Sequence, residues 1–260
     1  MINCPLIGNP GTARRVLFAI ASAAALALVA ASGVSAQVSD REIPIGNATS
    51  LRFNVSGSVR VMPVAGMSSI KLHVVDNGPS TPPMSIRTSR TGARLNVSVN
   101  GPGSAILPFV GQTGYELQLM YPPSLHLDLR EFEGRIHVEN VPASMQLYDA
   151  DGDIVVDGTQ APLTADADGG NITVTAARST LTLTAGTGDV AVTLAPGWRG
   201  SEVRLEASDG NLALNVPAGF RGRYDLTSGS GNVKNPLRSV PKAPLVFMLT
   251  EQGNVSIQTL

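Results

Sequence analysis

The chain has 260 residues, a formal net charge of −1, and 43% hydrophobic but only 4% aromatic residues. The near-neutral charge, with no clustered basic face, gives no indication of a nucleic-acid partner. With 27 glycines, 18 prolines and no stretch of sustained helical period, the composition favours an all-β protein over a helical one.

Residues 1–36 have the pattern of a signal peptide. Arg14 and Arg15 precede an apolar run over 16–31, and small residues at 34–36 offer a cleavage site. The run is shorter than the roughly 20 residues of a spanning helix. We expect export to the periplasm, the cell surface or the medium, with no membrane span left after cleavage; the alternative is a retained membrane anchor. Cleavage leaves 17 basic against 20 acidic side chains.

The only cysteine, Cys4, lies within this N-terminal segment. The expected exported protein therefore contains no disulfide, no thiol nucleophile and no cysteine metal ligand.

Residues 37–122 are expected to form an irregular N-terminal β cap region. Apolar residues alternate at 51–55, 70–74, 95–99 and 115–121, but these runs are not evenly spaced. Terminal units of repeat proteins are atypical because they cover an exposed end. The apolar loop 101–111 is expected to fold over that end; the alternative is a tip that contacts a partner.

Residues 123–260 carry one pattern seven times: a glycine, usually Asp or Asn, and then alternating apolar residues. Seven positions before each glycine stands an apolar residue, and a second apolar or small residue follows two positions later. Period-two alternation is typical of a strand with one buried face, so each repeat of 18–22 residues holds two strands. The corner glycines are Gly134, Gly152, Gly170, Gly188, Gly210, Gly231 and Gly253.

The Gly-Asx corner has a local physical explanation. Glycine tolerates positive φ, and Asn or Asp hydrogen-bonds to nearby backbone. We expect the corner side chains to stack along one edge as a structural ladder rather than a ligand site. These side chains are Asp153, Asn171, Asp189, Asn211, Asn232 and Asn254.

Short repeats of this kind form solenoids, in which each unit buries its apolar face against its neighbours. Two strands per repeat predict an all-β, parallel β-solenoid (β-helix-like) with two sheets packed face to face. A left-handed hexapeptide helix is rejected because its apolar register would fall on Gln160 and Asp166. The last repeat, ending at Leu260, is expected to leave a free C-terminal strand edge that could support self-association.

An acidic cluster is the best candidate for chemistry. Carboxylates suit Ca²⁺, and polysaccharide lyases and hydrolases use β-helices with paired acids. The spacing matches no calcium loop and no aromatic platform accompanies the acids, so we expect solvated turn residues, no cofactor and no catalytic residue. The weak metal candidates are Asp149, Asp151, Asp153, Asp166 and Asp168.

Two further groups of residues are candidates for a site. His73, His126 and His137 are far apart in the sequence and lack a metal-ligand spacing. Trp198-Arg199 and Phe220-Arg221 occupy equivalent loops of successive repeats. These four could form a surface for a glycan or a protein, although such aromatic residues more often anchor a loop over the sheet edge.

The stretch from Val216 to Val233, Val-Pro-Ala-Gly-Phe-Arg-Gly-Arg-Tyr-Asp-Leu-Thr-Ser-Gly-Ser-Gly-Asn-Val, resembles the bacterial putative-adhesin family related to autotransporter adhesin heads. The resemblance covers residues 51–260 and is strongest from Gly134 onward. It implies an exported β-solenoid and supplies no catalytic motif.

These observations predict an exported, non-enzymatic β-solenoid that acts as an adhesin-like binding or scaffold protein of the cell envelope, with an envelope protein or glycan as partner. The alternatives are a carbohydrate-active β-helix enzyme and a periplasmic component of an envelope-stress or signalling system.

Overall fold

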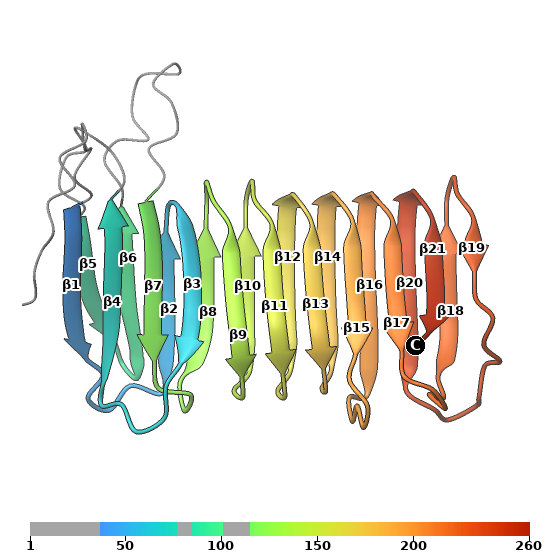
Figure 1. Ribbon diagram of the computed structural model, residues 1–260, viewed down its shortest axis with the longest axis horizontal. Helices are drawn as coiled ribbons and strands as arrows, with labels where there is room; N and C mark the ends of the chain where they lie inside the picture. Colours follow the sequence, from blue (N-terminus) through green and yellow to red (C-terminus); the bar gives the residue numbers. More distant parts are fainter. Residues whose placement is uncertain (1–36, 77–84, 101–114) are drawn as a thin grey trace, which may run out of the picture. The chain divides into compact units, whose positions relative to one another are not determined.

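The computed structural model describes residues 37–76, 85–100 and 115–260. The predicted signal peptide and the apolar loop 101–111 lie outside the described residues. The described strands belong to one compact unit, Val34–Leu260, and form two sheets (Figure 1). Within the described residues, no helix is long and apolar enough to cross a membrane.

The sheets are called A and B, and their strands are given in spatial order. Sheet A contains β1 (Gln37–Pro44), β4 (Ser69–Asp76), β7 (Tyr115–Tyr121), β3 (Ser58–Pro63), β9 (Ile136–Val141), β11 (Ile154–Thr159), β13 (Ile172–Ala177), β15 (Val190–Leu194), β17 (Leu212–Val216), β21 (Val255–Thr259) and β19 (Val233–Lys234). Sheet B contains β18 (Arg223–Ser228), β20 (Leu245–Gln252), β16 (Glu202–Asp209), β14 (Leu181–Thr187), β12 (Leu163–Gly169), β10 (Met145–Asp149), β8 (His126–Glu131), β2 (Ser50–Val55), β6 (Arg94–Asn100) and β5 (Ser85–Thr91).

Both sheets are parallel except where β1, β4 and β5 pair antiparallel at the N-terminal end. Successive strands of the repeats alternate between the sheets, so one strand of sheet B and the next strand of sheet A make one rung. The predicted parallel β-solenoid with two strands per repeat is confirmed, and so is the irregular β start of the chain.

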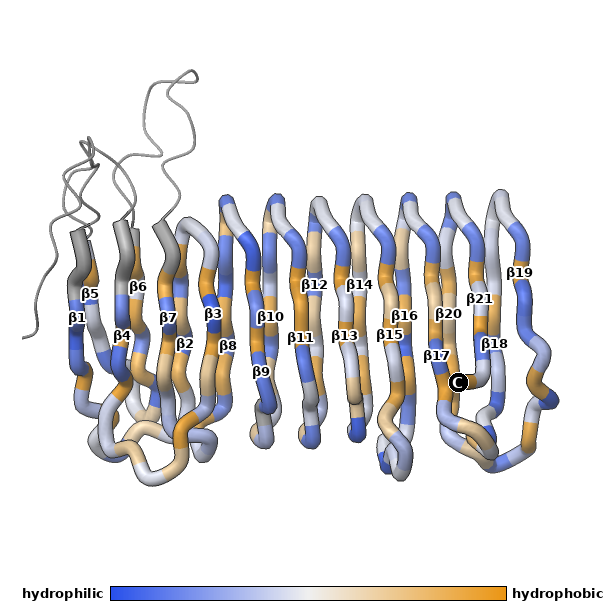
Figure 2. The backbone as a smooth tube through the Cα atoms, in the orientation of Figure 1, coloured by the Kyte–Doolittle hydropathy of each residue, from blue (hydrophilic) through white to orange (hydrophobic). Residues whose placement is uncertain are grey.

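The core lies between the two sheets and is built from columns of residues in register. Leu163 pairs with Leu181, which in turn pairs with Val203, and all three are fully or almost fully buried. In Figure 2, hydrophobic residues recur along the strands, whereas the turns above the repeats are mainly hydrophilic. Because every rung contributes to the same columns, a register shift of one residue would move the apolar side chains of a strand from the core face to the solvent face.

The corner glycines are required chiefly by close stacking. A Cβ atom on Gly170, Gly188 or Gly210 would overlap the carbonyl oxygen of the preceding corner glycine. Positive φ, the reason expected from the sequence, applies to only three of the seven corners, Gly170, Gly188 and Gly253. The glycines therefore mark the corners as predicted, but the main reason for glycine at these positions is contact between rungs.

This difference can be tested with two alanine variants. Gly188→Ala must accommodate both positive φ and a clash with backbone, whereas Gly197 has positive φ and no atom within 4 Å of the place that a Cβ would take. We expect Gly188→Ala to lower the free energy of unfolding by about 2–4 kcal/mol and Gly197→Ala by about 1 kcal/mol. Urea titration followed by circular dichroism measures both. Equal losses would mean that close stacking contributes nothing.

The rungs do not follow one another in sequence order at either end. The β2/β3 rung lies between β6/β7 and β8/β9, although the segments β4 to β7 intervene in the chain. At the other end, β20 and β21 are inserted between the β16/β17 rung and the β18/β19 rung.

The prediction that the final repeat leaves a free edge is therefore wrong. β21 pairs on both sides, with β17 and β19, and the outermost strands are β18 and β19. The burial of the inward side chains follows this order. The inward residues of β20, Val246 and Met248, are fully buried in the inner position, whereas Tyr224 and Leu226 of β18 are only half-buried at the end.

Candidate binding surface

The corner side chains form the predicted ladder. The side-chain Oδ1 of each corner residue accepts a hydrogen bond from the backbone N–H of the next, as from Asn171 to Asp153 (3.0 Å) and from Asn211 to Asp189 (2.7 Å). Asparagines add a second bond through their Nδ2 to the same oxygen. Asn254 bonds to Asn211 and Asn232 to Asn254, so the ladder follows the spatial order of the rungs rather than the sequence.

The two aspartates in the ladder have different neighbours. Asp153 ends it, where Arg135 pairs with its Oδ2 at 2.9 Å. The pKa of Asp153 is lowered, first by the backbone hydrogen bond from Asn171. Asp189 lies within the ladder and has no side-chain amide to donate to Asn171. Among the described contacts, Asn171 Oδ1 therefore accepts only the backbone N–H of Asp189. The backbone bonds of the ladder are thus complete, and the side-chain amide bond is missing at the step from Asp189 to Asn171.

Replacing each aspartate by asparagine should separate these roles. Asp189→Asn adds a side-chain donor facing Asn171 and is expected to raise the free energy of unfolding by about 0.5–1 kcal/mol. Asp153→Asn loses the ion pair with Arg135 and is expected to lower it by up to about 1 kcal/mol. Urea titrations of both variants and the unchanged protein measure these differences in the free energy of unfolding. A loss of stability in Asp189→Asn would contradict the ladder as described.

The structure divides the acidic cluster among different environments. Asp153 belongs to the ladder, and Asp149 is fully buried. Asp166 and Asp168 are exposed on sheet B, where Tyr148 Oη donates to Asp168 Oδ2 at 2.6 Å. Within the described residues, no group of three or more His, Cys, Asp or Glu side chains is placed to hold a metal ion.

The buried Asp149 has a partner that the sequence pattern alone did not identify. Glu131 occupies the position in register on β8, and both side chains are buried. Asp149 Oδ1 accepts the backbone N–H groups of Asp151 and Gly152, and Glu131 Oε1 accepts those of Gly57 and Glu133. The remaining oxygens, Asp149 Oδ2 and Glu131 Oε2, are buried without a hydrogen-bond partner.

Two buried carboxyl groups this close cannot both ionise at low cost. Burial, and next the charge of Glu131, raise the pKa of Asp149 to about 7. Asp149 is therefore protonated in the folded state below about that pH. The signal was present in the sequence, because Glu131 continues the inward alternation of Leu127 and Leu129.

This pair gives the folded protein a defined pH dependence. Because the pKa of Asp149 is raised in the fold from 3.8 to about 7, the folded state binds more protons than the unfolded state between these values. Its stabilising contribution is complete below about pH 4 and is lost as the pH rises through about 7. We expect Asp149→Asn to flatten the fall in the free energy of unfolding over this range. An unchanged slope in that variant would assign the pH dependence to other groups.

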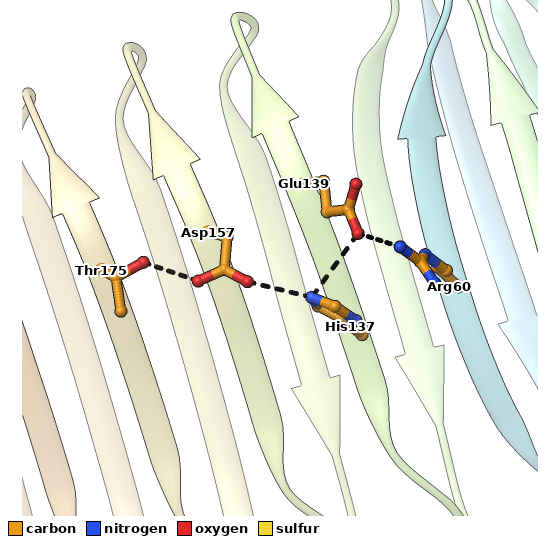
Figure 3. Close-up of polar contacts among 5 residues, drawn as sticks. All are labelled: Arg60, His137, Glu139, Asp157 and Thr175. Atoms are coloured by element: carbon orange, nitrogen blue, oxygen red, sulfur yellow. Dashed lines mark hydrogen bonds and ion pairs between the residues drawn. The ribbon is translucent and has the colours of Figure 1, made fainter.

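The outer face of sheet A carries a connected polar network (Figure 3). Arg60 of β3 pairs with Glu139 of β9, and His137 Nε2 lies 3.1 Å from Asp157 Oδ2 and 3.9 Å from Glu139 Oε1. Thr175 Oγ1 of β13 donates to Asp157 Oδ1 at 2.6 Å. Four successive strands thus hold their outward side chains in fixed positions.

The network does not have the geometry of a catalytic triad. A nucleophilic hydroxyl must hydrogen-bond to the histidine that accepts its proton. Here both Thr175 and His137 bond to Asp157, and the Thr175 bond, followed by the His137 bond, lowers the pKa of Asp157. The arrangement pairs charges across neighbouring strands and places Thr175 on the carboxylate rather than on the histidine.

The outer face of sheet B has a second set of fixed side chains. Arg52 pairs with the largely buried Asp128 at 2.6 Å, and Arg130 Nε lies 3.5 Å from the same carboxyl group. Phe132 is 46% exposed and contacts Tyr148 edge to face. Among the side chains that the structure describes, this face thus combines an exposed aromatic ring with carboxylates.

The structure separates the remaining candidates. His73 contacts Asp40, His126 contacts Ser144, and only His137 joins the network above. Trp198 donates from Nε1 to Ser179 O at 2.7 Å and lies 5.6 Å, centroid to centroid, from Phe220. Both rings pack against the core from neighbouring loops. This is the geometry of a loop anchor, while Arg199 and Arg221 are exposed beside it.

The sequence matches no protein-family model and no curated protein. The structure matches that of a putative adhesin from Bacteroides fragilis NCTC 9343 with a TM-score of 0.51, at 14% identity, over 87% of this chain and 99% of that chain. The chain shares its fold with a putative bacterial adhesin. The resemblance noted from the sequence is thereby confirmed at the level of the fold.

Two weaker structural matches have similar descriptions. A putative cell adhesion protein from Clostridium sporogenes ATCC 15579 matches at a TM-score of 0.42 and 8% identity, over 87% of this chain and 100% of that chain. A putative adhesin from Parabacteroides distasonis ATCC 8503 matches at 0.34 and 10%, over 86% and 97%.

Proposed function

We propose that this chain is an exported, non-enzymatic β-solenoid that acts as an adhesin-like binding or scaffold protein of the cell envelope. The observation that carries the proposal is the match to the Bacteroides fragilis putative adhesin along nearly the whole of both chains. A signal-peptide pattern at 1–36 supports export.

The outer face of sheet A is the proposed contact surface. Its side chains are held by cross-strand bonds from Arg60 to Thr175, so a partner would bind without first ordering them. Both signs of charge occur side by side, which suits a polar glycan or a protein surface of mixed charge better than a nucleic acid.

The carbohydrate-active alternative requires two carboxylates that flank a bond in an accessible groove. Asp149 is buried with Glu131, Asp153 is held by Arg135 and Asn171, and Asp168 accepts a hydrogen bond from Tyr148. These separate roles favour the binding proposal over the enzyme. The proposal therefore expects Asp151→Ala and Asp168→Ala to leave partner binding unchanged.

Protease shaving of intact cells tests the location. If the protein is displayed for adhesion, protease removes it while a periplasmic control protein survives. Protection until the outer membrane is opened would place it in the periplasm and leave only the scaffold role.

Cross-linking tests the contact surface. A photo-cross-linking amino acid at Thr173 lies on the outer face of sheet A, and the same amino acid at Thr164 lies on the outer face of sheet B. We expect the variant at residue 173 to yield an adduct with an envelope component and the matched variant at residue 164 to yield at least about tenfold less. No adduct from either position in living cells would refute a binding role for these faces.

A further inference from the structure

We propose that the protein forms a two-fold symmetric dimer in which β18 of one copy pairs antiparallel with β18 of a second copy. The inference is independent of the proposed function. It rests on the difference between the two ends of the solenoid and on the backbone groups that β18 leaves unpaired.

The end formed by β18 and β19 has an incompletely covered apolar cross-section. Leu226 continues the buried column of Leu205 and Met248, yet it is only half-buried because no described strand lies beyond it. Val233 of β19 is 46% exposed. Each of these residues occupies a position that is fully buried in the rungs before it, such as Leu212 and Val255 beside Val233.

The opposite end carries a charged side chain at an inward register position. Arg90 of β5 stands opposite Leu95 and therefore faces inward, and it donates to Ile45 O at 2.8 Å and to Asn47 Oδ1 at 2.9 Å. A head-to-tail stack would have to bury this guanidinium group without its hydration. Pairing of the two open ends avoids that cost and closes the assembly at two copies.

The outer edge of β18 is half covered by its own chain. In a parallel pair, alternate residues direct their backbone groups toward the neighbour, and Arg223 and Gly229 bond to the β20 side. The backbone N–H and C=O groups of residues 222, 224, 226 and 228 therefore point away from β20. Val240 N–H covers Gly222 O at 2.9 Å and Ser239 Oγ covers Tyr224 N–H at 3.2 Å, which leaves the second half of the strand for a partner.

The remaining free backbone groups of β18 are complementary to the same groups of a second copy when a two-fold axis passes beside Leu226. Leu226 N–H and C=O would pair with the same groups of the second copy, and each Ser228 N–H would reach the opposite Tyr224 C=O. The two Leu226 side chains would meet on the core side. On the outer face, Asp225 would stand opposite Thr227, so no like charges directly oppose one another.

The interface is small, so a weak and reversible dimer is expected. Leu226→Pro removes the N–H that faces the partner, but it breaks no described intramolecular hydrogen bond. Proline is also tolerated on such an edge strand. The purified protein, in the form that cells accumulate, should approach twice the monomer mass in sedimentation equilibrium as its concentration rises. Leu226→Pro and Leu226→Lys should each weaken dimerisation at least about tenfold, whereas the matched outward variant Thr227→Lys should not.

Disulfide trapping tests the pairing itself, in a Cys4→Ser background. Residues opposite each other in a hydrogen-bonded antiparallel pair are about 5.5 Å apart between Cα atoms, within disulfide range. Oxidation should therefore trap Leu226→Cys as a covalent dimer but leave Thr227→Cys largely monomeric. The proposal is overturned if the protein keeps a monomer mass at all concentrations or grows beyond a dimer. It is also overturned if both Leu226→Pro and Leu226→Lys leave the dimer intact, or if oxidation traps a dimer through Thr227→Cys alone.

Discussion

The rungs can stack at the spacing of hydrogen-bonded strands only because the corners carry no side chain at the point of contact. The main chain of one corner glycine lies against the carbonyl group of the corner before it, closer than a side chain would permit. The Asx residue that follows then bonds to the next corner through its side chain, so contact and hydrogen bond act at the same place. The inward columns of both sheets can only coincide from rung to rung if this corner repeats unchanged, and for that reason the length variation falls in the opposite loops.

The same constraint explains how a rung can be inserted out of sequence order. β20/β21 meets β16/β17 through an identical corner, with Asn254 bonded to Asn211, and it presents an identical corner to Asn232. Since every corner is compatible with every other, burial decides which rung lies inside. The repeat with Val246 and Met248 takes the inner place, where both are fully buried, and the repeat with Tyr224 and Leu226 ends the sheet.

Much of this fold could be predicted because its determinants are local and periodic. Alternation, the corner glycines and the Asx ladder are all visible within one repeat. The order of the rungs could not be predicted, because it depends on a comparison of burial among repeats whose corners are alike. The Glu131–Asp149 pair was missed for a related reason. Asp149 was grouped with its sequence neighbours Asp151 and Asp153, while its partner in space lies one rung earlier.

The candidate surface was the least predictable feature, and the reason is physical. Inward positions must be apolar in every rung, so they leave a pattern, whereas outward positions need only be soluble. Arg60 and His137 come from rungs that are neighbours only because β2/β3 lies beside β8/β9. The network of Figure 3 thus depends on the exchanged rung order at the N-terminal end. A repeat protein that exchanges rungs at its ends can bring together surface residues from distant segments without altering the corners that hold it together.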